Sequence, residues 1–321
     1  MTDHLQKTST SGETQTRGGV PEFSILIGLV STEDSDRILQ TLESLRNQQG
    51  SHSYEVIIGD RRHDEISSRI DAEFQEVRRI PCPPDMSLPE LRTRALDEAR
   101  GTYIVVTEDH CVPSGNWLFS MAQAFSEAPD GTVAVGGCVE NGVHDTALDW
   151  ATFLCEYSFF IKPVEEGVTT VLPGMNVAYH HSIFDNLDRK LLTSGFWETT
   201  VHPVLVDKGL KLYSSNSIVL YHCKKFSRGL FARQRFIYSR YYAGLRFRSD
   251  QILKRIFACG ATILLPPLLL YRISRQVRAK GRLASEFRSA LPDLLLFYII
   301  WAYGEMVGYI LGTGDALARI E

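Results

Sequence analysis

Residues 103–110 read Tyr-Ile-Val-Val-Thr-Glu-Asp-His, and this segment is the best guide to the architecture of the chain. Its first part is an apolar, β-branched run, which is typical of a strand buried on both faces of a parallel sheet. The run ends in three side chains that can bind a metal or carry a proton. Because ligands of open α/β sheets bind at the carboxyl ends of the strands, we expect Glu108, Asp109 and His110 to lie at a functional site. The alternative is an exposed loop without a ligand.

Strands and helices alternate on both sides of this segment. The helices carry apolar residues at helical spacing, and two of them are preceded by possible capping pairs, Ser31 with Asp34 and Ser87 with Glu90. This alternation predicts an α/β fold with a Rossmann-like, mostly parallel sheet and helices on both faces. The predicted strands are 23–30, 55–59, 77–80, 103–107 and 132–135, with later strands at 177–179 and 217–221 and a helical segment at 198–209.

Charge is distributed unevenly along the chain. Residues 222–290 contain 16 Lys and Arg against only Asp250 and Glu286, whereas the whole chain has a net charge of −4. An acidic body followed by a basic, apolar region indicates a surface that faces anionic lipid or phosphate. No recognisable nucleic-acid-binding motif accompanies this charge, so we expect no nucleic-acid partner. Six cysteines without a C-x-x-C pair are typical of a reducing compartment.

Two apolar segments, 256–271 and 294–304, lie near the C-terminus. Both are shorter than the ~20 clean residues of a spanning helix, and a basic loop separates them. If both segments spanned the bilayer, this loop would lie across the membrane from a cytosolic domain, which the positive-inside rule disfavours. We therefore expect helices that lie in, or dip into, the cytosolic leaflet. A buried helical hairpin that packs on the domain is the alternative.

These observations divide the chain into three parts. Residues 1–20, rich in Thr, Ser, Gly and Gln and without the layout of a signal peptide, are predicted to be a disordered tail. Residues 21–221 form the α/β domain. Residues 222–321 form a basic amphipathic and hydrophobic, membrane-associated helical region, in which cations alternate with aromatic side chains.

The order of several motifs resembles the family 2 glycosyltransferases of GT-A fold over residues 22–248. The resemblance rests on Glu55-Val56-Ile57-Ile58-Gly59-Asp60, on Leu91-Arg92-Thr93-Arg94-Ala95-Leu96 and on the strand that ends in the acidic triplet. It implies an inverting enzyme that uses a nucleoside-diphosphate sugar, Mn²⁺ or Mg²⁺, and a glycan or lipid-linked acceptor. Together with the basic region, it places the protein at the cytosolic face of the cell (inner) membrane.

The resemblance also implies roles for individual residues. Asp60 would accept a hydrogen bond from the base of the nucleotide, and Arg92 would help to hold the nucleotide; a turn aspartate and a solvated arginine are the alternatives. Glu108 and Asp109 stand where the family has its metal-binding Asp-x-Asp, with Asp109, His110 and His222 as metal ligands. The outer positions of this triplet are Glu and His rather than two aspartates, and an imidazole shifts the preference towards Mn²⁺.

On the acceptor side, Glu198 matches the first acid of the Glu-Asp motif of the family. Because Thr199 replaces the second acid and cannot accept a proton, Glu198 is the expected catalytic base. Trp197 would form an apolar wall or stack on a sugar ring, and Asn176 would hydrogen-bond the sugar. The alternatives are a helix N-terminal acid for Glu198 and a plain turn for Asn176.

Two other functions stay open at the level of sequence. A catalytically inactive, nucleotide-binding scaffold of a glycan-assembly complex would explain the unusual triplet and Thr199. A nucleotidyltransferase would share the nucleotide-binding sheet, but its phosphate loop after the first strand is normally rich in glycine. Here Ile27-Gly28-Leu29-Val30-Ser31 offers a single glycine.

Overall fold

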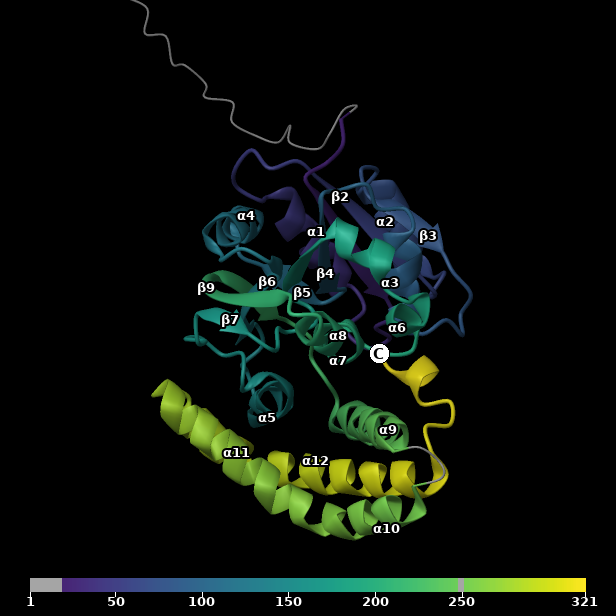
Figure 1. Ribbon diagram of the computed structural model, residues 1–321, viewed down its shortest axis with the longest axis vertical. Helices are drawn as coiled ribbons and strands as arrows, with labels where there is room; N and C mark the ends of the chain where they lie inside the picture. Colours follow the sequence, from purple (N-terminus) through teal and green to yellow (C-terminus); the bar gives the residue numbers. More distant parts are fainter. Residues whose placement is uncertain (1–18, 248–250) are drawn as a thin grey trace, which may run out of the picture.

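The computed structural model describes residues 19–247 and 251–321, and within these residues nine strands form one sheet. Helices cover both faces of the sheet, and a layer of C-terminal helices lies along one side of this α/β body (Figure 1). The predicted α/β class is therefore confirmed. Residues 1–18, which make up most of the predicted N-terminal tail, lie outside the described residues.

The strands of the sheet are β1 (Phe23–Leu29), β2 (Tyr54–Asp60), β3 (Arg78–Pro81), β4 (Tyr103–Glu108), β5 (Cys111–Pro113), β6 (Thr132–Asn141), β7 (Gly167–Thr169), β8 (Val177–His180) and β9 (Lys211–His222). Their order is β3-β2-β1-β4-β8-β6-β9-β5, and β7 also pairs with β9. The β3-β2-β1-β4 half is parallel, as predicted. The other half is mixed, because β8, β5 and β7 run antiparallel to their neighbours.

The helices are α1 (Arg37–Arg46), α2 (Glu65–Glu73), α3 (Leu88–Leu96), α4 (Trp117–Glu127), α5 (Ala147–Tyr157), α6 (Arg189–Thr193), α7 (Trp197–Thr200), α8 (His202–Asp207), α9 (Arg228–Arg246), α10 (Ile252–Ala261), α11 (Leu265–Lys280) and α12 (Ala284–Leu311). Short 3-10 turns are η1 (His181–Asn186), η2 (Thr262–Leu264) and η3 (Leu317–Arg319). Successive side chains of a strand point to opposite faces. Ile25 and Ile27 of β1 therefore pack in the core that includes residues of α1 and α4, and Leu26 packs in the core that includes residues of α3 and α8.

Local signals in the sequence had mixed outcomes. The Ser87–Glu90 capping box is present and begins α3. Ser31 caps no helix, because α1 begins only at Arg37 and the Ser31 hydroxyl donates instead to Asp109. The helical segment predicted at 198–209 is two short helices, α7 and α8.

Two segments near the C-terminus, Ile252–Lys280 and Ala284–Leu311, are long and apolar enough to cross a membrane by length and composition. The expectation that these segments are too short was wrong, because the helices continue through charged residues on both sides of the apolar runs. Pro266 and Pro267 do not interrupt the first segment. They lie in the first turn of α11, where a backbone N–H has no partner in any case. Two such helices are consistent with the predicted membrane-associated region.

Candidate active site

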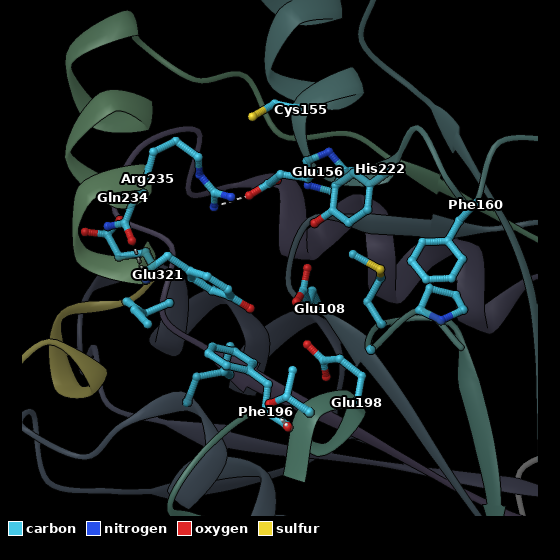
Figure 2. A pocket seen from close by; sticks show the side chains of 18 of the residues that line it. Glu108, Cys155, Glu156, Phe160, Phe196, Glu198, His222, Gln234, Arg235 and Glu321 are labelled. Atoms are coloured by element: carbon cyan, nitrogen blue, oxygen red, sulfur yellow. Dashed lines mark hydrogen bonds and ion pairs between the residues drawn. The ribbon is translucent and has the colours of Figure 1, made fainter. Parts of the chain in front are cut away.

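A cavity of about 300 Å³ lies where the sheet meets the C-terminal helices (Figure 2). It is next to the carboxyl end of β4, beside the switch point between β1 and β4 at which the strand order reverses. Open α/β sheets bind their ligands at this place. The carboxyl, imidazole and guanidinium side chains that line it are Glu108, His110, Glu156, Glu198, His222, Arg235 and Glu321.

Three of these side chains form a triad whose donor atoms all lie within 4.8 Å of one another: Glu108, His110 and His222. Nε2 of His110 is 3.1 Å from Nε2 of His222 and 3.4 Å from Oε2 of Glu108. His222 reaches this position because β5 pairs antiparallel with the end of β9, with Cys111 opposite His222. One carboxylate oxygen and two imidazole nitrogens that converge in this way fit a divalent cation.

The pKa values of the two histidines are shifted in opposite directions. Burial and the neighbouring His110 lower the pKa of His222 well below its ordinary value, so His222 is neutral and offers a lone pair. Burial also disfavours a charged His110, but hydrogen bonds with Asp109 and Glu108 outweigh burial and raise the pKa of His110. A cation held by both rings would compete with protons for the imidazole nitrogens.

Asp109, which the sequence places among the metal ligands, is outside this triad. Its buried carboxylate accepts hydrogen bonds from the backbone N–H groups of Val30 and Ser31, at 2.9 and 2.8 Å, and from the Ser31 hydroxyl, at 2.6 Å. It also lies 2.7 Å from Nδ1 of His110. A carboxylate on the far nitrogen of a ligating histidine fixes the orientation of the ring. Asp109 therefore holds the His110 ring in place, and Glu108 is the carboxylate that converges with the two histidines.

Arg92 lies behind the triad rather than in the cavity. The side chain is 1% exposed, and its Nη2 donates to Oε1 of Glu108 at 3.1 Å. Burial disfavours a charged Glu108, but its partners His110 and Arg92 prevail and lower its pKa to about 2. Glu108 is therefore a carboxylate at every physiological pH, and Arg92 holds it in place.

Glu198, in the first turn of α7, points into the same cavity (Figure 2). Its Oε2 is buried and has no hydrogen-bond partner among the described residues. Burial raises its pKa, against the lowering effect of Arg92. The carboxyl group packs so closely on Gly174 that a Cβ there would lie 2.2 Å from Oε2. A side chain at position 174 would thus displace this carboxyl group, whose proton affinity is above normal.

Two predicted acceptor-side residues are structural in their contacts. Trp197 is 1% exposed, donates from Nε1 to the carbonyl of Leu192 and packs in the core between α3, β8 and α8. Asn176 is fully buried; its side chain accepts from Nε1 of Trp117 and donates to the carbonyl of Cys138. Phe196, next to Trp197, lines the cavity instead.

Asp60 ends β2, as predicted, but its carboxylate does not reach the cavity. It is fully buried and accepts from the Ser67 hydroxyl at 2.6 Å, from Nη1 of Arg79 at 3.0 Å and from the backbone N–H of Arg62 at 2.7 Å. Arg62 and its neighbour Arg61 line a second hollow of about 440 Å³. Asp60 thus fixes the backbone of the loop that lines this hollow.

The sequence did not identify a buried ion pair in the cavity, Arg235 of α9 with Glu156 of α5 (Figure 2). The guanidinium of Arg235 lies over the rings of Phe231, Tyr238 and Trp301, at 4.8, 5.1 and 5.6 Å from their centroids. The available signal was the dense mixture of cations and aromatic residues after His222. The contact with Trp301 of α12 could not be predicted, because it depends on how the C-terminal helices pack.

Comparisons with known proteins agree with this geometry. The profile described as glycosyl transferase family 2 matches residues 29–188. A search of curated proteins finds no match.

Two solved structures have a similar fold. One is the mannosyltransferase PcManGT from Pyrobaculum calidifontis in complex with GDP-Man and Mn²⁺, with a TM-score of 0.52 and 13% identity, over 90% of this chain and 88% of that one. The other is GalNAc-T7 with UDP, GalNAc and Mn²⁺, with a TM-score of 0.50 and 13% identity, over 66% of this chain and 45% of that one. At this identity the likeness establishes the GT-A fold.

Proposed function

We propose that this chain, which the glycosyl transferase family 2 profile matches over residues 29–188, is an inverting enzyme that moves a sugar from a nucleoside-diphosphate donor to a glycan or lipid-linked acceptor. The product would serve polysaccharide or glycoconjugate assembly. The observation that carries the proposal is that Glu198 and the triad of Glu108, His110 and His222 line one cavity at the switch point of the sheet.

Glu108, His110 and His222 are the residues that would hold a divalent cation, and Asp109 would orient His110. When bound, the cation offsets the negative charge that grows on the departing diphosphate. Two imidazole ligands favour Mn²⁺ over Mg²⁺. In support, both solved structures with a similar fold contain Mn²⁺.

Glu198 is the proposed catalytic base. The acceptor hydroxyl gives its proton to the Glu198 carboxylate while the acceptor oxygen bonds to the anomeric carbon. The bond from that carbon to the diphosphate oxygen breaks, and its electron pair leaves with the nucleoside diphosphate. One displacement of this kind inverts the anomeric centre. A raised pKa makes the carboxylate a stronger base, and the missing hydrogen-bond partner leaves it free to accept the proton.

The nucleotide would contact the loops after β1 and β2. Asp60 contributes to this contact by fixing the backbone of Arg62, and Arg92 contributes by holding Glu108. Both residues thus shape the nucleotide site from behind it. Asn176 and Trp197 support the acceptor side in the same indirect way, through the loop before β8 and through α7.

The membrane region of this proposal begins after His222, where β9 ends. A helical hairpin of α10, α11 and α12 exposes large apolar side chains such as Leu253, Phe257 and Ile263, which are 83, 80 and 79% exposed. Exposed apolar surface on this scale indicates a membrane or a partner. Basic residues on α11, among them Arg272, Arg275 and Arg278, would meet anionic headgroups.

The hairpin is tied to the α/β domain at both ends, which favours an orientation in the plane of the membrane. Near the turn of the hairpin, Arg282 pairs with Glu140 at 3.0 Å and Lys280 donates to the carbonyl of Pro163. Near the other end, the residues that follow α12 contact the α/β domain, where Arg61 donates to the carbonyls of Ala318 and Ile320. α12 is about 42 Å long at 1.5 Å per residue, more than the ~30 Å hydrocarbon core. A spanning orientation would therefore pull parts of the α/β domain into the bilayer.

The side of attachment is proposed to be the cytosolic face of the inner membrane. All six cysteines, which lie within the described residues, are free thiols, in keeping with a reducing compartment. A cavity walled by α9 and α12 would open close to the membrane surface, where a lipid-linked acceptor is found.

Release of nucleoside diphosphate from a panel of nucleotide sugars, with Mn²⁺ and a lipid extract as acceptor, tests the proposal. We expect release by the wild type, and its loss in Glu198→Gln. Glu165→Gln, an exposed acid outside the cavity, is the matched control and should keep full activity. An inactive scaffold would bind nucleotide without turnover, and a nucleotidyltransferase would release pyrophosphate. Either result contradicts the proposal.

A further inference from the structure

The chain segment that follows α12, residues 316–321, returns to the α/β domain and lies on the loops after β1 and β2 (Figure 1). Arg61 donates to the carbonyls of Ala318 and Ile320, at 3.0 and 3.2 Å. The Glu321 carboxylate accepts from the hydroxyl and the backbone N–H of Thr32, at 2.7 and 3.3 Å. The polar groups of Thr32 and Arg61 are therefore occupied by this tail, as residues 316–321 are called below.

The tail is also packed by apolar contacts. Ile320 is 2% exposed and belongs to a cluster with Val30, Leu88 and Phe196. Gln234 of α9 holds the backbone from the other side: it donates to the carbonyl of Arg319 at 3.4 Å and accepts from the N–H of Glu321 at 3.2 Å. The tail is thus packed and hydrogen-bonded against the rest of the protein.

Its position divides the crevice above the sheet. On one side is the cavity with Glu198 and the metal triad, and on the other is the hollow lined by Arg61 and Arg62; Glu321 lines both. A nucleoside diphosphate with its diphosphate at the triad and its nucleoside over the ends of β1 and β2 would pass through the place of Ile320 and Glu321. The tail and such a donor cannot occupy this place together.

We propose that the tail is an internal competitor of the donor, and that Thr32 and Arg61 are donor-binding residues that pass from the tail to the nucleotide. This proposal rests on the proposed function. The tail and a nucleotide can use the same protein donors, because the tail presents a carboxylate and two carbonyls, which are all hydrogen-bond acceptors. A nucleoside diphosphate presents acceptors too, in its base carbonyls, ribose hydroxyls and phosphate oxygens. Closure by the tail lowers the apparent affinity for donor by the fraction of molecules that are open.

Nucleotide binding to a tail variant is the first test. UDP, GDP, TDP and CDP are titrated calorimetrically with Mn²⁺ into the wild type, into Glu321→Ala and into the control Asp315→Asn, an exposed residue just before the tail and outside both hollows. For a tail that is closed about ten to one, Glu321→Ala tightens the apparent Kd by up to about tenfold. The control leaves the Kd unchanged. Weaker or equal binding by Glu321→Ala overturns the proposal.

Hydrogen exchange of the unmodified protein is the second test and needs no variant to fold. Saturating nucleotide should increase amide exchange in residues 316–321 and decrease it at the end of β1. Protection of the tail by nucleotide would make it part of the bound site and overturn the competition. If none of the four nucleotides binds the wild type or Glu321→Ala, the proposed function fails together with this proposal. If a nucleotide binds but amide exchange in residues 316–321 does not change, the competition is contradicted while the proposed function is not.

Discussion

Burial of the Glu198 carboxyl group favours its protonated form, whereas the proposed role as a catalytic base requires the ionised form. Oε2 of Glu198 is buried and has no hydrogen-bond partner among the described residues, and burial raises the pKa of the carboxyl group. The folded protein therefore binds this proton more tightly than the unfolded chain does. That preference stabilises the fold below the unfolded pKa of ~4.3 and is lost as the pH rises through the raised value. At neutral pH the base must be ionised, and its buried charge then lowers the stability of the folded protein.

The prediction is that Glu198→Gln loses activity and gains stability. Without a base, kcat should fall by about 10²–10⁴. The neutral amide avoids the buried charge, so the melting temperature at pH 7.5 should rise by about 2 °C, and the gain should shrink towards pH 4. Steady-state kinetics and thermal unfolding across pH measure both effects. A variant that is inactive but less stable at pH 7.5 would point to a structural role for the carboxyl group.

The metal triad makes a second prediction at this scale. Mn²⁺ should raise the melting temperature of the wild type, because it binds the folded triad and not the unfolded chain. His222→Gln should remove this rise. Asp109→Asn should weaken Mn²⁺ binding by about 10–100-fold, because Asp109 only orients His110. His144→Gln, an exposed histidine outside the triad, is the control. A rise of wild-type size in His222→Gln would show that the cation binds elsewhere.

Single residues were predictable to the extent that local sequence positions them. The sequence predicted Glu108 and His110 at the end of β4 and Glu198 near the start of a helix, and all three side chains line the cavity. The sequence did not show which of the two carboxylates, Glu108 or Asp109, would converge with the two histidines. This choice depends on the backbone of Val30 and Ser31, which takes up the Asp109 carboxylate. The contacts of Asp60 were not predictable for the same reason, since its partners come from α2 and β3.

Among the elements, α12 packs on α9 through a face of small residues. A Cβ at Gly308 would lie 2.4 Å from the carbonyl of Arg240, and one at Gly304 would lie 2.6 Å from the carbonyl of Phe236. Glycines four residues apart allow helix backbones to approach this closely. The contact fixes Trp301, and with it one wall around Arg235.

Gly308→Leu should therefore destabilise the protein by about 1–3 kcal/mol or more, because the added side chain meets backbone atoms that cannot move aside. Gly260→Leu is the matched control, since Gly260 of α10 has no atom within 4 Å of its would-be Cβ. Thermal unfolding of both variants in detergent measures the difference. Equal melting temperatures would contradict the close packing of α9 and α12.

The sequence predicted the elements of the α/β domain better than the helical hairpin, for a physical reason. The spacing of apolar residues in strands and helices reports burial against one core. β1 is buried throughout, and β2 and β4 are buried at all positions except Glu55, Tyr103 and Glu108. The helices of the hairpin instead contain charged residues that pair with other side chains of the folded protein. Glu305, which interrupts the apolar run, accepts from Nε1 of Trp301 and from the Tyr309 hydroxyl. Counting uncharged residues therefore underestimated the length of α12.

For the whole molecule, the arrangement of domain and hairpin decides how the protein meets a membrane. A spanning hairpin would place its turn across the bilayer from the α/β domain. The turn instead contacts that domain through Arg282 and Glu140. We therefore predict that the turn and the α/β domain lie on the same side of the membrane.

Cysteine labelling tests this prediction in sealed vesicles. Ser285→Cys, beside the turn, is compared with Ser68→Cys on the α/β domain, both exposed, in a background that lacks Cys155 and Cys259, the native thiols that are not fully buried. A membrane-impermeant maleimide should label both positions from the same side, because the hairpin lies in the plane of one leaflet. Leu268→Cys, on the apolar face of α11, should stay unlabelled while the vesicles are intact and react after detergent is added. Labelling of Ser285→Cys only from the opposite side would mean that the hairpin spans the bilayer and that the contact between Arg282 and Glu140 is broken there.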